Sequence, residues 1–135
     1  MSAQTLVAIV DNDESVRESL PYLVRVLGFS IRVFCSAEDF LASDCVGQTR
    51  CLILDVALAG MSGPDLQQEL SRRGHWIPII FITAQNDERL RNHVLEQGAV
   101  ECLFKPFSDK AMLEALTVAV RGSGYQAGGD CDELS

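Results

Sequence analysis

Four polar residues that could act together on a phosphate follow separate stretches of apolar residues. They are Asp11, Asp55, Thr83 and Lys105. A carboxylate can attack phosphorus and carry the phosphoryl group as an acyl phosphate. Because the transferred group spreads negative charge over its oxygens, a metal ion, an ammonium group and a hydroxyl donor would stabilise it. In this set Asp55 would be the nucleophile, and the other three groups would position and neutralise the phosphoryl group.

The charge around Asp55 predicts a cation close by. Asp55 directly follows Cys51–Leu54, the most uniformly apolar run in the chain. A second carboxylate 4 Å away would repel it by about 4 kcal/mol at an effective dielectric of 20. Lys105 and a divalent metal are the available kinds of cation, and oxygen ligands favour Mg²⁺ over zinc. Asp11, with its neighbours, would hold the metal.

Most of these residues also have an ordinary structural explanation. Asp11, Asn12 and Asp13 are residue types that favour turns and helix caps. Thr83 is β-branched, as is usual in strands, and Lys105 could be a solvated turn residue. The occurrence of polar groups at four strand ends, rather than any single residue, supports a site.

The elements that must position these residues are read from hydrophobic periodicity. Apolar runs of strand length alternate with segments of helical period, which predicts a three-layer α/β fold with helices on both faces of a parallel sheet. Ligands bind such sheets outside the carboxyl ends of the strands, where the four polar residues fall. The expected strands are Leu6–Val10, Ser30–Phe34, Cys51–Leu54, Ile77–Ile82 and Glu101–Phe104.

Five helices are expected between and after these strands. They are a helix from Val16 to Leu27 ended by Gly28, one opened by a capping box at Ser36–Asp39, one with Pro64 in its first turn, one ended by Gly98, and one through Met112 and Val120. Residues 1–121 would form one domain. Residues 122–135 are polar, acidic and glycine-containing, and we expect a flexible linker or tail that leads to an output domain outside this sequence.

Composition limits the classes of function. A chain of 135 residues makes one ordinary domain. Its net charge of −8 is opposite in sign to that of a surface that binds the phosphate backbone of nucleic acid. No apolar run approaches the roughly 18–20 residues that span a bilayer. The start, Met-Ser-Ala-Gln-Thr, lacks the features of a signal peptide. The five cysteines contain no Cys-x-x-Cys pair, so we expect reduced thiols in a cytoplasmic domain.

In combination, these motifs resemble the receiver domain of two-component response regulators over about residues 5 to 120. The segment Ser36-Ala-Glu-Asp-Phe40-Leu41 is most similar to the FixJ-like subgroup, whose receivers usually precede a LuxR-type helix-turn-helix domain. The motifs that carry the resemblance are Ile-Val-Asp11-Asn12-Asp13, Asp55 followed by Met61-Ser62-Gly63, Ile82-Thr83-Ala84, and Phe104-Lys105-Pro106-Phe107.

The resemblance implies a flavodoxin-like (CheY-like) (βα)5 fold with strand order 2-1-3-4-5. It also implies that a sensor histidine kinase phosphorylates Asp55 to control an output such as transcription. The phosphoryl group would contact Thr83 and Lys105, and the bond before Pro106 would be cis. DNA would be bound only through a separate C-terminal domain, and the family often dimerises through the face of the fourth helix, fifth strand and fifth helix. The implied Mg²⁺ ligands are Asp11, Asn12, Asp55 and the Ala57 carbonyl.

Two positions depart from the family pattern. When the motif is matched through Arg17, the usual acidic pair falls on Asp11 and Asn12. Asn12 keeps an oxygen but removes a charge, so we expect weaker Mg²⁺ binding unless Asp13 substitutes. The switch position, where the family commonly has a Tyr or Phe that moves inward with Thr83, is Cys102, which has no ring to move.

Two other interpretations compete with a phosphorylated receiver. A degenerate receiver would keep the fold and bind a partner without phosphate, as Asn12 and Cys102 suggest. A haloacid-dehalogenase-type phosphatase would use Asp11 as nucleophile and Asp13 as general acid. That interpretation leaves Asp55 unexplained, and the sequence lacks the later acidic pair and cap domain of such phosphatases. In the preferred interpretation the domain is a phosphoacceptor rather than an enzyme with its own substrate.

Overall fold

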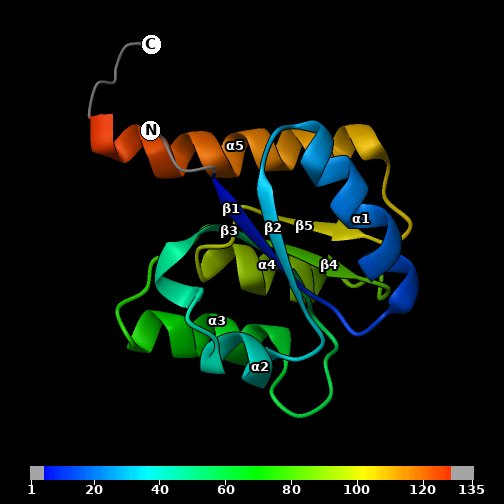
Figure 1. The fold of residues 1–135 in the computed structure, drawn as a ribbon. Coiled ribbons are helices and arrows are strands. Elements are labelled where there is room, and N and C mark those ends of the chain that lie inside the picture. Colours follow the sequence, from blue (N-terminus) through cyan, green and yellow to red (C-terminus); the bar gives the residue numbers. More distant parts are fainter. Residues whose placement is uncertain (1–4, 129–135) are drawn as a thin grey trace.

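A five-stranded parallel sheet forms the centre of the molecule (Figure 1). The structure is a computed structural model, and it describes residues 5–128. The strand order is β2-β1-β3-β4-β5, which confirms the predicted topology. The strands are β1 (Leu6–Val10), β2 (Ser30–Phe34), β3 (Thr49–Asp55), β4 (Ile79–Thr83) and β5 (Glu101–Phe104).

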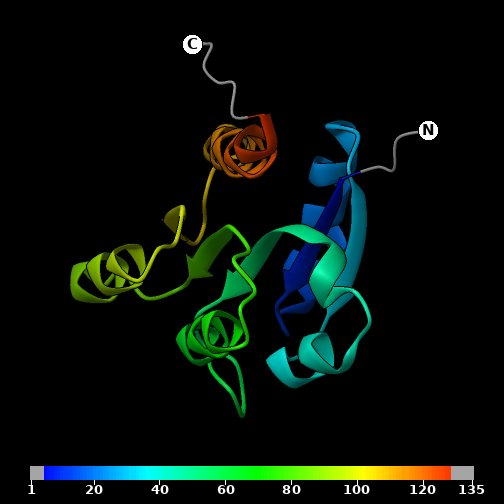
Figure 2. The same ribbon diagram turned by 90° about the vertical axis from the view of Figure 1, so that its left-hand side faces the viewer.

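Helices cover both faces of this sheet, as Figure 2 shows along a direction at right angles to Figure 1. Helices α1 (Glu14–Val26) and α5 (Asp109–Gly128) lie on one face. Helices α2 (Ala37–Ala42), α3 (Gly63–Arg72) and α4 (Glu88–Glu96) lie on the other. A short 3₁₀ helix, η1 (Val46–Gln48), precedes β3 and was not expected from the sequence.

Alternation along the strands divides the core into two layers. In β3, Leu52 and Leu54 are buried in the layer beneath α2, α3 and α4. Cys51 and Ile53 are buried in the layer beneath α1 and α5. Both faces of the strand are therefore apolar, as expected for the centre of a parallel sheet.

The strand register brings the polar strand ends to one edge of the sheet. Val10 pairs with Leu54, Asp55 with Ile82, and Thr83 with Phe104. Because neighbouring strands lie about 4.8 Å apart, residues at these aligned ends can reach one another.

Two strands differ from the predicted bounds. β3 begins two residues earlier, at Thr49, and β4 begins at Ile79 rather than Ile77. Proline has no N–H to donate to a ladder, and Pro78 contributes only its carbonyl, which accepts a hydrogen bond from the Leu52 N–H at 2.9 Å. At their other ends, both strands run one residue further than predicted. Asp55 and Thr83 are therefore the last residues of their strands rather than the first residues after them.

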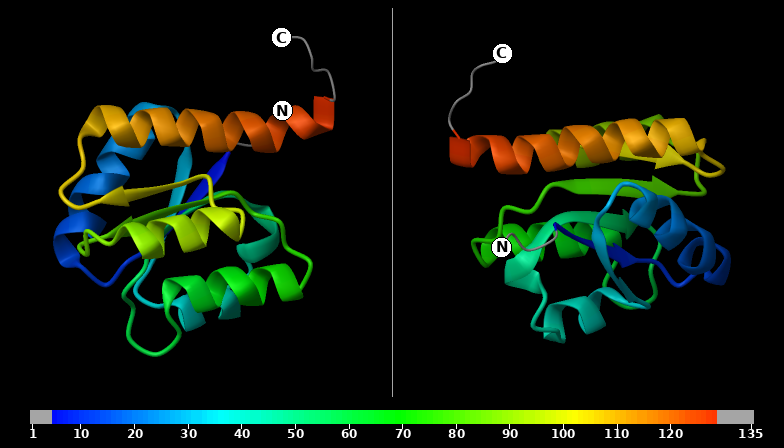
Figure 3. Two further views of the ribbon diagram at one scale, coloured as in Figure 1. Left: turned by 180° about the vertical axis from the view of Figure 1, so that it is seen from behind. Right: turned by 45° about the horizontal axis from the view of Figure 1, so that its top comes forward.

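The last helix extends beyond the predicted start of the linker. The predicted linker begins at 122, but α5 continues without a break to Gly128 (Figure 3). Glycine and polar residues lower helix propensity, but adding residues to an existing helix is far easier than starting one. The remainder of the predicted tail, 129–135, lies outside the described residues. Within the described part of the chain, no helix has both the length and the apolar character needed to cross a bilayer.

Candidate functional site

The Lys105 ammonium group is surrounded by carboxylates at the carboxyl edge of the sheet. Its Nζ lies 3.1 Å from Asp11 Oδ2, 3.7 Å from Asp55 Oδ2 and 3.8 Å from Asp13 Oδ2. Asp11 is completely buried and Asp55 nearly so, whereas Asp13 is exposed at the rim. Two segments far apart in the sequence, Asp11–Asp13 and the end of β3, therefore converge on a cation that a third segment supplies.

Local hydrogen bonds fix the Asp11 carboxylate. Its backbone N–H donates to the Phe34 carbonyl at 3.1 Å, which continues the pairing of β1 with β2 by one residue. Its Oδ1 accepts from the Asp13 N–H at 2.7 Å, which turns the chain toward α1. Oδ2 is left to face Lys105. Asp11 therefore forms the predicted turn and also directs one carboxylate oxygen toward Lys105.

The end of β3 holds Asp55 in a similar way. Asp55 Oδ1 accepts from the Ala57 N–H at 3.1 Å, and the Val56 N–H donates to the Ile82 carbonyl at 3.0 Å. The backbone of Gly63, the first residue of α3, packs directly on the Asp55 carbonyl, and a Cβ at position 63 would collide with that oxygen. This close approach requires glycine and anchors the start of α3 beside the carboxylate.

The electrostatic surroundings raise the pKa of Asp55 to about 6. Burial is the largest cause, followed by repulsion from the Asp11 carboxylate. The Ala57 N–H and the Lys105 ammonium act in the opposite direction but do not cancel the increase. The site thus holds more negative charge than one lysine balances, which is the situation that an added cation would relieve.

Thr83 and Lys105 complete the edge from β4 and the end of β5. The Lys105 N–H donates to the Thr83 carbonyl at 2.7 Å. The Thr83 hydroxyl accepts from the Gln85 N–H at 3.0 Å, so its own proton remains available for donation to another acceptor. The peptide bond between Lys105 and Pro106 is cis, as the resemblance implies.

The two departures from the family pattern occupy different surroundings. Asn12 is exposed beside the buried Asp11. Cys102 pairs with Phe81 in the sheet and is buried in the layer beneath α4. This burial raises the pKa of the Cys102 thiol to about 11, so it is a core residue in the thiol form.

The carboxyl edge fits a hard dication such as Mg²⁺ in chemistry and in charge. Among residues 5–128 no cluster of three or more His, Cys, Asp or Glu side chains has the arrangement of a complete metal cage. Mg²⁺ does not need one, since it usually binds one or two carboxylates and keeps several waters. Asp11 and Asp55 supply two carboxylates on one side of the site, and the excess negative charge there favours a cation.

Glu38 lies beside this edge and was not predicted from the sequence as a functional residue. Glu38, in α2, accepts a hydrogen bond from the Met61 N–H at 2.9 Å and so ties α2 to the loop between β3 and α3. Its carboxylate lies 2.6 Å from where a Cβ of Gly60 would stand, and Gly60 has a φ of +74°. In the sequence, Gly60 indicated only a loop, because nothing in a single sequence pairs it with a residue 22 positions earlier.

The fold and this edge together define a receiver domain. The family model for the response regulator receiver domain matches residues 7–117, and the chain belongs to this family. The match favours the receiver over the dehalogenase-type phosphatase. The chain is 42% identical over 118 residues to nodulation protein W of Bradyrhizobium diazoefficiens, covering 87% of this chain and 52% of that protein. It is 39% identical to the transcriptional regulatory protein TdiR of Thauera aromatica, covering 84% and 50%.

Solved structures agree with this assignment. The response regulator StyR superposes with a TM-score of 0.86 at 38% identity, covering 94% of this chain and 64% of that one. The structure of FixJ-N superposes with a TM-score of 0.78 at 34% identity, covering 89% and 96%. The chain spans about half the length of the curated relatives it matches.

Proposed function

We propose that this receiver domain accepts a phosphoryl group on Asp55 from a sensor histidine kinase, with Mg²⁺ as cofactor. The observation that carries the proposal is the position of Lys105 Nζ, 3.1 Å from Asp11 and 3.7 Å from Asp55. A structural ion pair would need one carboxylate for one lysine. A second buried carboxylate with a raised pKa is costly, and such groups cluster at functional sites.

Each residue of the site would have its own role in phosphoryl transfer. An Asp55 carboxylate oxygen forms the new bond to phosphorus while the bond from phosphorus to the imidazole nitrogen of the kinase breaks. The Lys105 ammonium and the Thr83 hydroxyl stabilise the oxygens of the transferred group. Asp11, Asp55 and the Ala57 carbonyl would hold Mg²⁺, with Asn12 and Asp13 as further oxygen donors; when bound, Mg²⁺ supplies positive charge to the phosphoryl oxygens.

Intact mass spectrometry tests this function directly. The protein is incubated with acetyl phosphate and MgCl₂, and a single adduct of one phosphoryl group on Asp55 is expected. Asp55→Asn should give no adduct, and EDTA should prevent its formation. Turnover of a phosphomonoester without an adduct would instead support the phosphatase interpretation.

A degenerate receiver is the second candidate, and Asn12 is the observation that favours it. Asn12 removes one negative charge beside Asp11, so Mg²⁺ would bind more weakly than in receivers with an acidic pair. If the mass stays unchanged at high Mg²⁺ and phosphodonor concentrations while the protein still binds a partner, the degenerate receiver is the correct interpretation.

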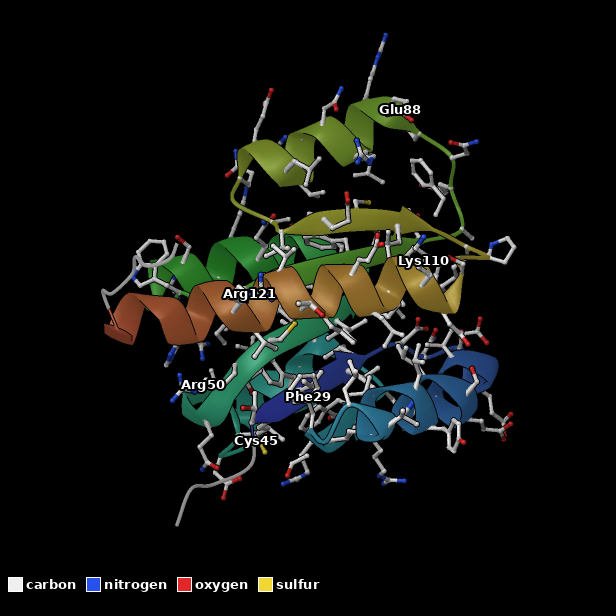
Figure 4. The ribbon with its side chains drawn as sticks, turned by 90° about the horizontal axis from the view of Figure 1, so that it is seen from above. Phe29, Cys45, Arg50, Glu88, Lys110 and Arg121 are labelled. Carbon is white, nitrogen blue, oxygen red and sulfur yellow. The ribbon has the colours of Figure 1, made fainter. Side chains whose placement is uncertain are left out.

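The cellular role follows from the relatives and is part of the proposal. Relatives such as TdiR are named as transcriptional regulators, which supports control of transcription in the cytoplasm through a DNA-binding output domain of the LuxR type. Homodimerisation would use the α4, β5 and α5 face. Figure 4 shows this face from above, with α5 carrying Lys110 and Arg121 and with α4 beginning at Glu88. Analytical ultracentrifugation with and without phosphodonor tests the dimer.

A further inference from the structure

Few apolar contacts hold helix α4 to the rest of the domain. Of its nine residues only Val94 is buried, whereas Leu90 and Leu95 are partly exposed. Figure 4 shows α4 at the outside of the molecule beside β5, which is an edge strand of the sheet. Elements that bury little apolar surface separate from a fold most easily. The position of α4 therefore depends strongly on the hydrogen bonds and ion pairs that it forms with neighbouring elements.

Arg91 joins the middle of α4 to β5. Its Nη2 lies 2.9 Å from Glu101 Oε1, and its Nε donates to the Cys102 carbonyl at 3.4 Å. The same Glu101 oxygen accepts a hydrogen bond from the Cys102 N–H at 2.9 Å. We call this set of contacts the Arg91 clamp. A further bond, from Gln67 to the Val94 carbonyl at 3.3 Å, joins α4 to α3 rather than to the sheet.

The thiol of Cys102 lies under α4 and can report on the clamp. Cys102 is 2% exposed and packs in the same core layer as Val94. Arg91 and Glu88, both on α4, act electrostatically on this thiol, which places it close to the helix. Separation of α4 from β5 would therefore bring the thiol into contact with solvent.

The Arg91 clamp joins two elements that each lead to one residue of the phosphoryl site. Thr83 ends β4, and the chain then reaches the N-cap of α4 at Asp87. The Thr83 hydroxyl accepts from the Gln85 N–H at 3.0 Å, so a shift of this hydroxyl moves the loop that leads to α4. Lys105 directly follows β5, and its N–H donates to the Thr83 carbonyl at 2.7 Å. Thr83, α4, the clamp, β5 and Lys105 therefore form a closed ring of covalent bonds, hydrogen bonds and one ion pair.

Within this ring the clamp is the connection that breaks most easily. Thr83 is completely buried, so its backbone bond to Lys105 is shielded from water. The side chains of Arg91 and Glu101 are each about one third exposed, and ion pairs open to solvent stabilise a structure only slightly. A displacement of the loop after Thr83 is therefore accommodated at the clamp rather than in the sheet.

We propose that the Arg91 clamp opposes the acceptance of a phosphoryl group and that the bound group opens the clamp. A phosphoryl group that draws the Thr83 hydroxyl toward Asp55 displaces the loop bonded to this hydroxyl, and α4 moves with the loop. This coupling rests on the proposed phosphorylation of Asp55, whereas the clamp itself does not. Linkage makes the effect reciprocal: if the bound group favours the open clamp, loss of the clamp strengthens binding of the group.

Alkylation of Cys102 measures the clamp in the protein without metal or phosphodonor. Each variant is treated with N-ethylmaleimide for increasing times, and each cysteine is quantified by peptide mass spectrometry. We expect Arg91→Gln to react about 2- to 5-fold faster at Cys102 than Arg89→Gln, the range for one partly exposed ion pair. Arg89 is exposed on the same helix, so its variant makes the same change in charge. Cys51, buried on the other face of the sheet, should react at the same rate in both.

Beryllofluoride, which mimics a phosphoryl group, measures the coupling. It is titrated in saturating MgCl₂ into the unmodified protein and both variants, and binding is followed by calorimetry. We expect Arg91→Gln to bind it about 2- to 5-fold more tightly than Arg89→Gln, although both variants have lost one positive charge. In the unmodified protein, bound beryllofluoride should also speed the alkylation of Cys102 and leave that of Cys51 unchanged.

Glu101→Gln tests the clamp from its other side. The amide keeps an oxygen for the Cys102 N–H but removes the charge that pairs with Arg91, so this variant should behave like Arg91→Gln in both assays. The double variant should add little to either single change, because both remove the same interaction.

The two assays separate failure of the clamp from failure of the coupling. Equal reaction of Cys102 in Arg91→Gln and Arg89→Gln, or an increase at Cys51 as large as that at Cys102, would overturn the clamp. Equal affinity of these variants for beryllofluoride would overturn the coupling and leave the proposed phosphorylation intact. Failure of every form to bind beryllofluoride would contradict the proposed function and the coupling with it, while alkylation still decides the clamp.

Discussion

The completely buried carboxylate of Asp11 is paired with the ammonium group of Lys105, 94 residues later in the chain, at 3.1 Å. Lys105 is itself largely buried. Taking either charge out of water is unfavourable unless the other is present. The pair therefore ties the end of β1 to the end of β5, and the same lysine must also serve Asp55.

Removal of the shared cation should destabilise the metal-free protein. Lys105→Gln leaves Asp11 and Asp55 facing each other, and we expect the free energy of unfolding to fall by about 2 kcal/mol, less than for a fully buried pair because the site borders solvent. Urea unfolding in EDTA measures the change. Lys110→Gln is the matched control, since Lys110 is exposed and is the only other lysine. Equal loss in the two variants would contradict the role of Lys105.

Asp55 should make the metal-free protein less stable as pH rises. The pKa of Asp55 is about 6 in the folded state, against 3.8 for an unperturbed aspartate. Between these pH values the folded state therefore binds more protons than the unfolded state. By linkage, the contribution of the Asp55 proton to the free energy of unfolding is fully present below pH 3.8 and is lost as pH rises through 6. Asp55→Asn removes the dependence. We expect the variant to be more stable by about 2–3 kcal/mol at pH 7, since each pKa unit corresponds to about 1.4 kcal/mol, and nearly equal below pH 4. Unfolding in EDTA at several pH values checks this, and a constant difference across the range would contradict it.

A second negative charge beside Asp11 should strengthen Mg²⁺ binding. Asn12 is exposed at the rim, so Asn12→Asp adds a carboxylate in a well-solvated position, where one charge contributes about 1 kcal/mol at contact distances. We expect about a fivefold lower Kd for Mg²⁺ by calorimetric titration. Asn92→Asp, exposed on α4, makes the same change in net charge as a control. Equal affinities of Asn12→Asp and the unmodified protein would show that Asp13 already substitutes.

The carboxyl edge was predictable because it depends on strand ends. Parallel strands place their carboxyl ends at the same edge of the sheet, even if the register differs slightly from the observed one. The proximity of four residues could therefore be predicted from hydrophobic periodicity alone: Asp11, Asp55, Thr83 and Lys105. The strand bounds of β1, β2 and β5 follow from apolar runs that end in polar residues or turns. What a single sequence predicts is thus the convergence of side chains that the sheet itself aligns.

Contacts between loops and helices could not be predicted in this way. Glu38 meets Met61, and Gln67 meets the Val94 carbonyl, through packing of separate elements that no periodicity aligns. The extension of α5 past residue 121 is a different case, because weak local propensity was overridden by continuation of a long helix.

Gly63 should be intolerant of any side chain. A Cβ there would collide with the Asp55 carbonyl and stand 3.0 Å from the Phe81 ring, and neither the backbone nor a completely buried ring can yield easily. We expect Gly63→Ala to lower the free energy of unfolding by about 2 kcal/mol. Gly47→Ala serves as control, because its Cβ would meet nothing within 4 Å, and it should change stability by less than about 0.5 kcal/mol. Thermal unfolding of both variants decides the matter, and a tolerated Gly63→Ala would mean that α3 can move away from β3.

Glu38 should tune the metal site through the loop between β3 and α3. Its bond to the Met61 N–H is exposed, so its loss affects global stability little, but this loop carries the Ala57 carbonyl toward the proposed cation. We expect Glu38→Ala to raise the Kd for Mg²⁺ by about 2- to 5-fold, the effect of one modest hydrogen bond. Glu38→Gln keeps an oxygen acceptor and should restore most of the affinity. The neighbouring Asp39→Ala controls for the lost charge on α2. If Glu38→Ala and Asp39→Ala weaken binding equally, the effect is one of net charge, and the hydrogen bond to Met61 does not position the loop.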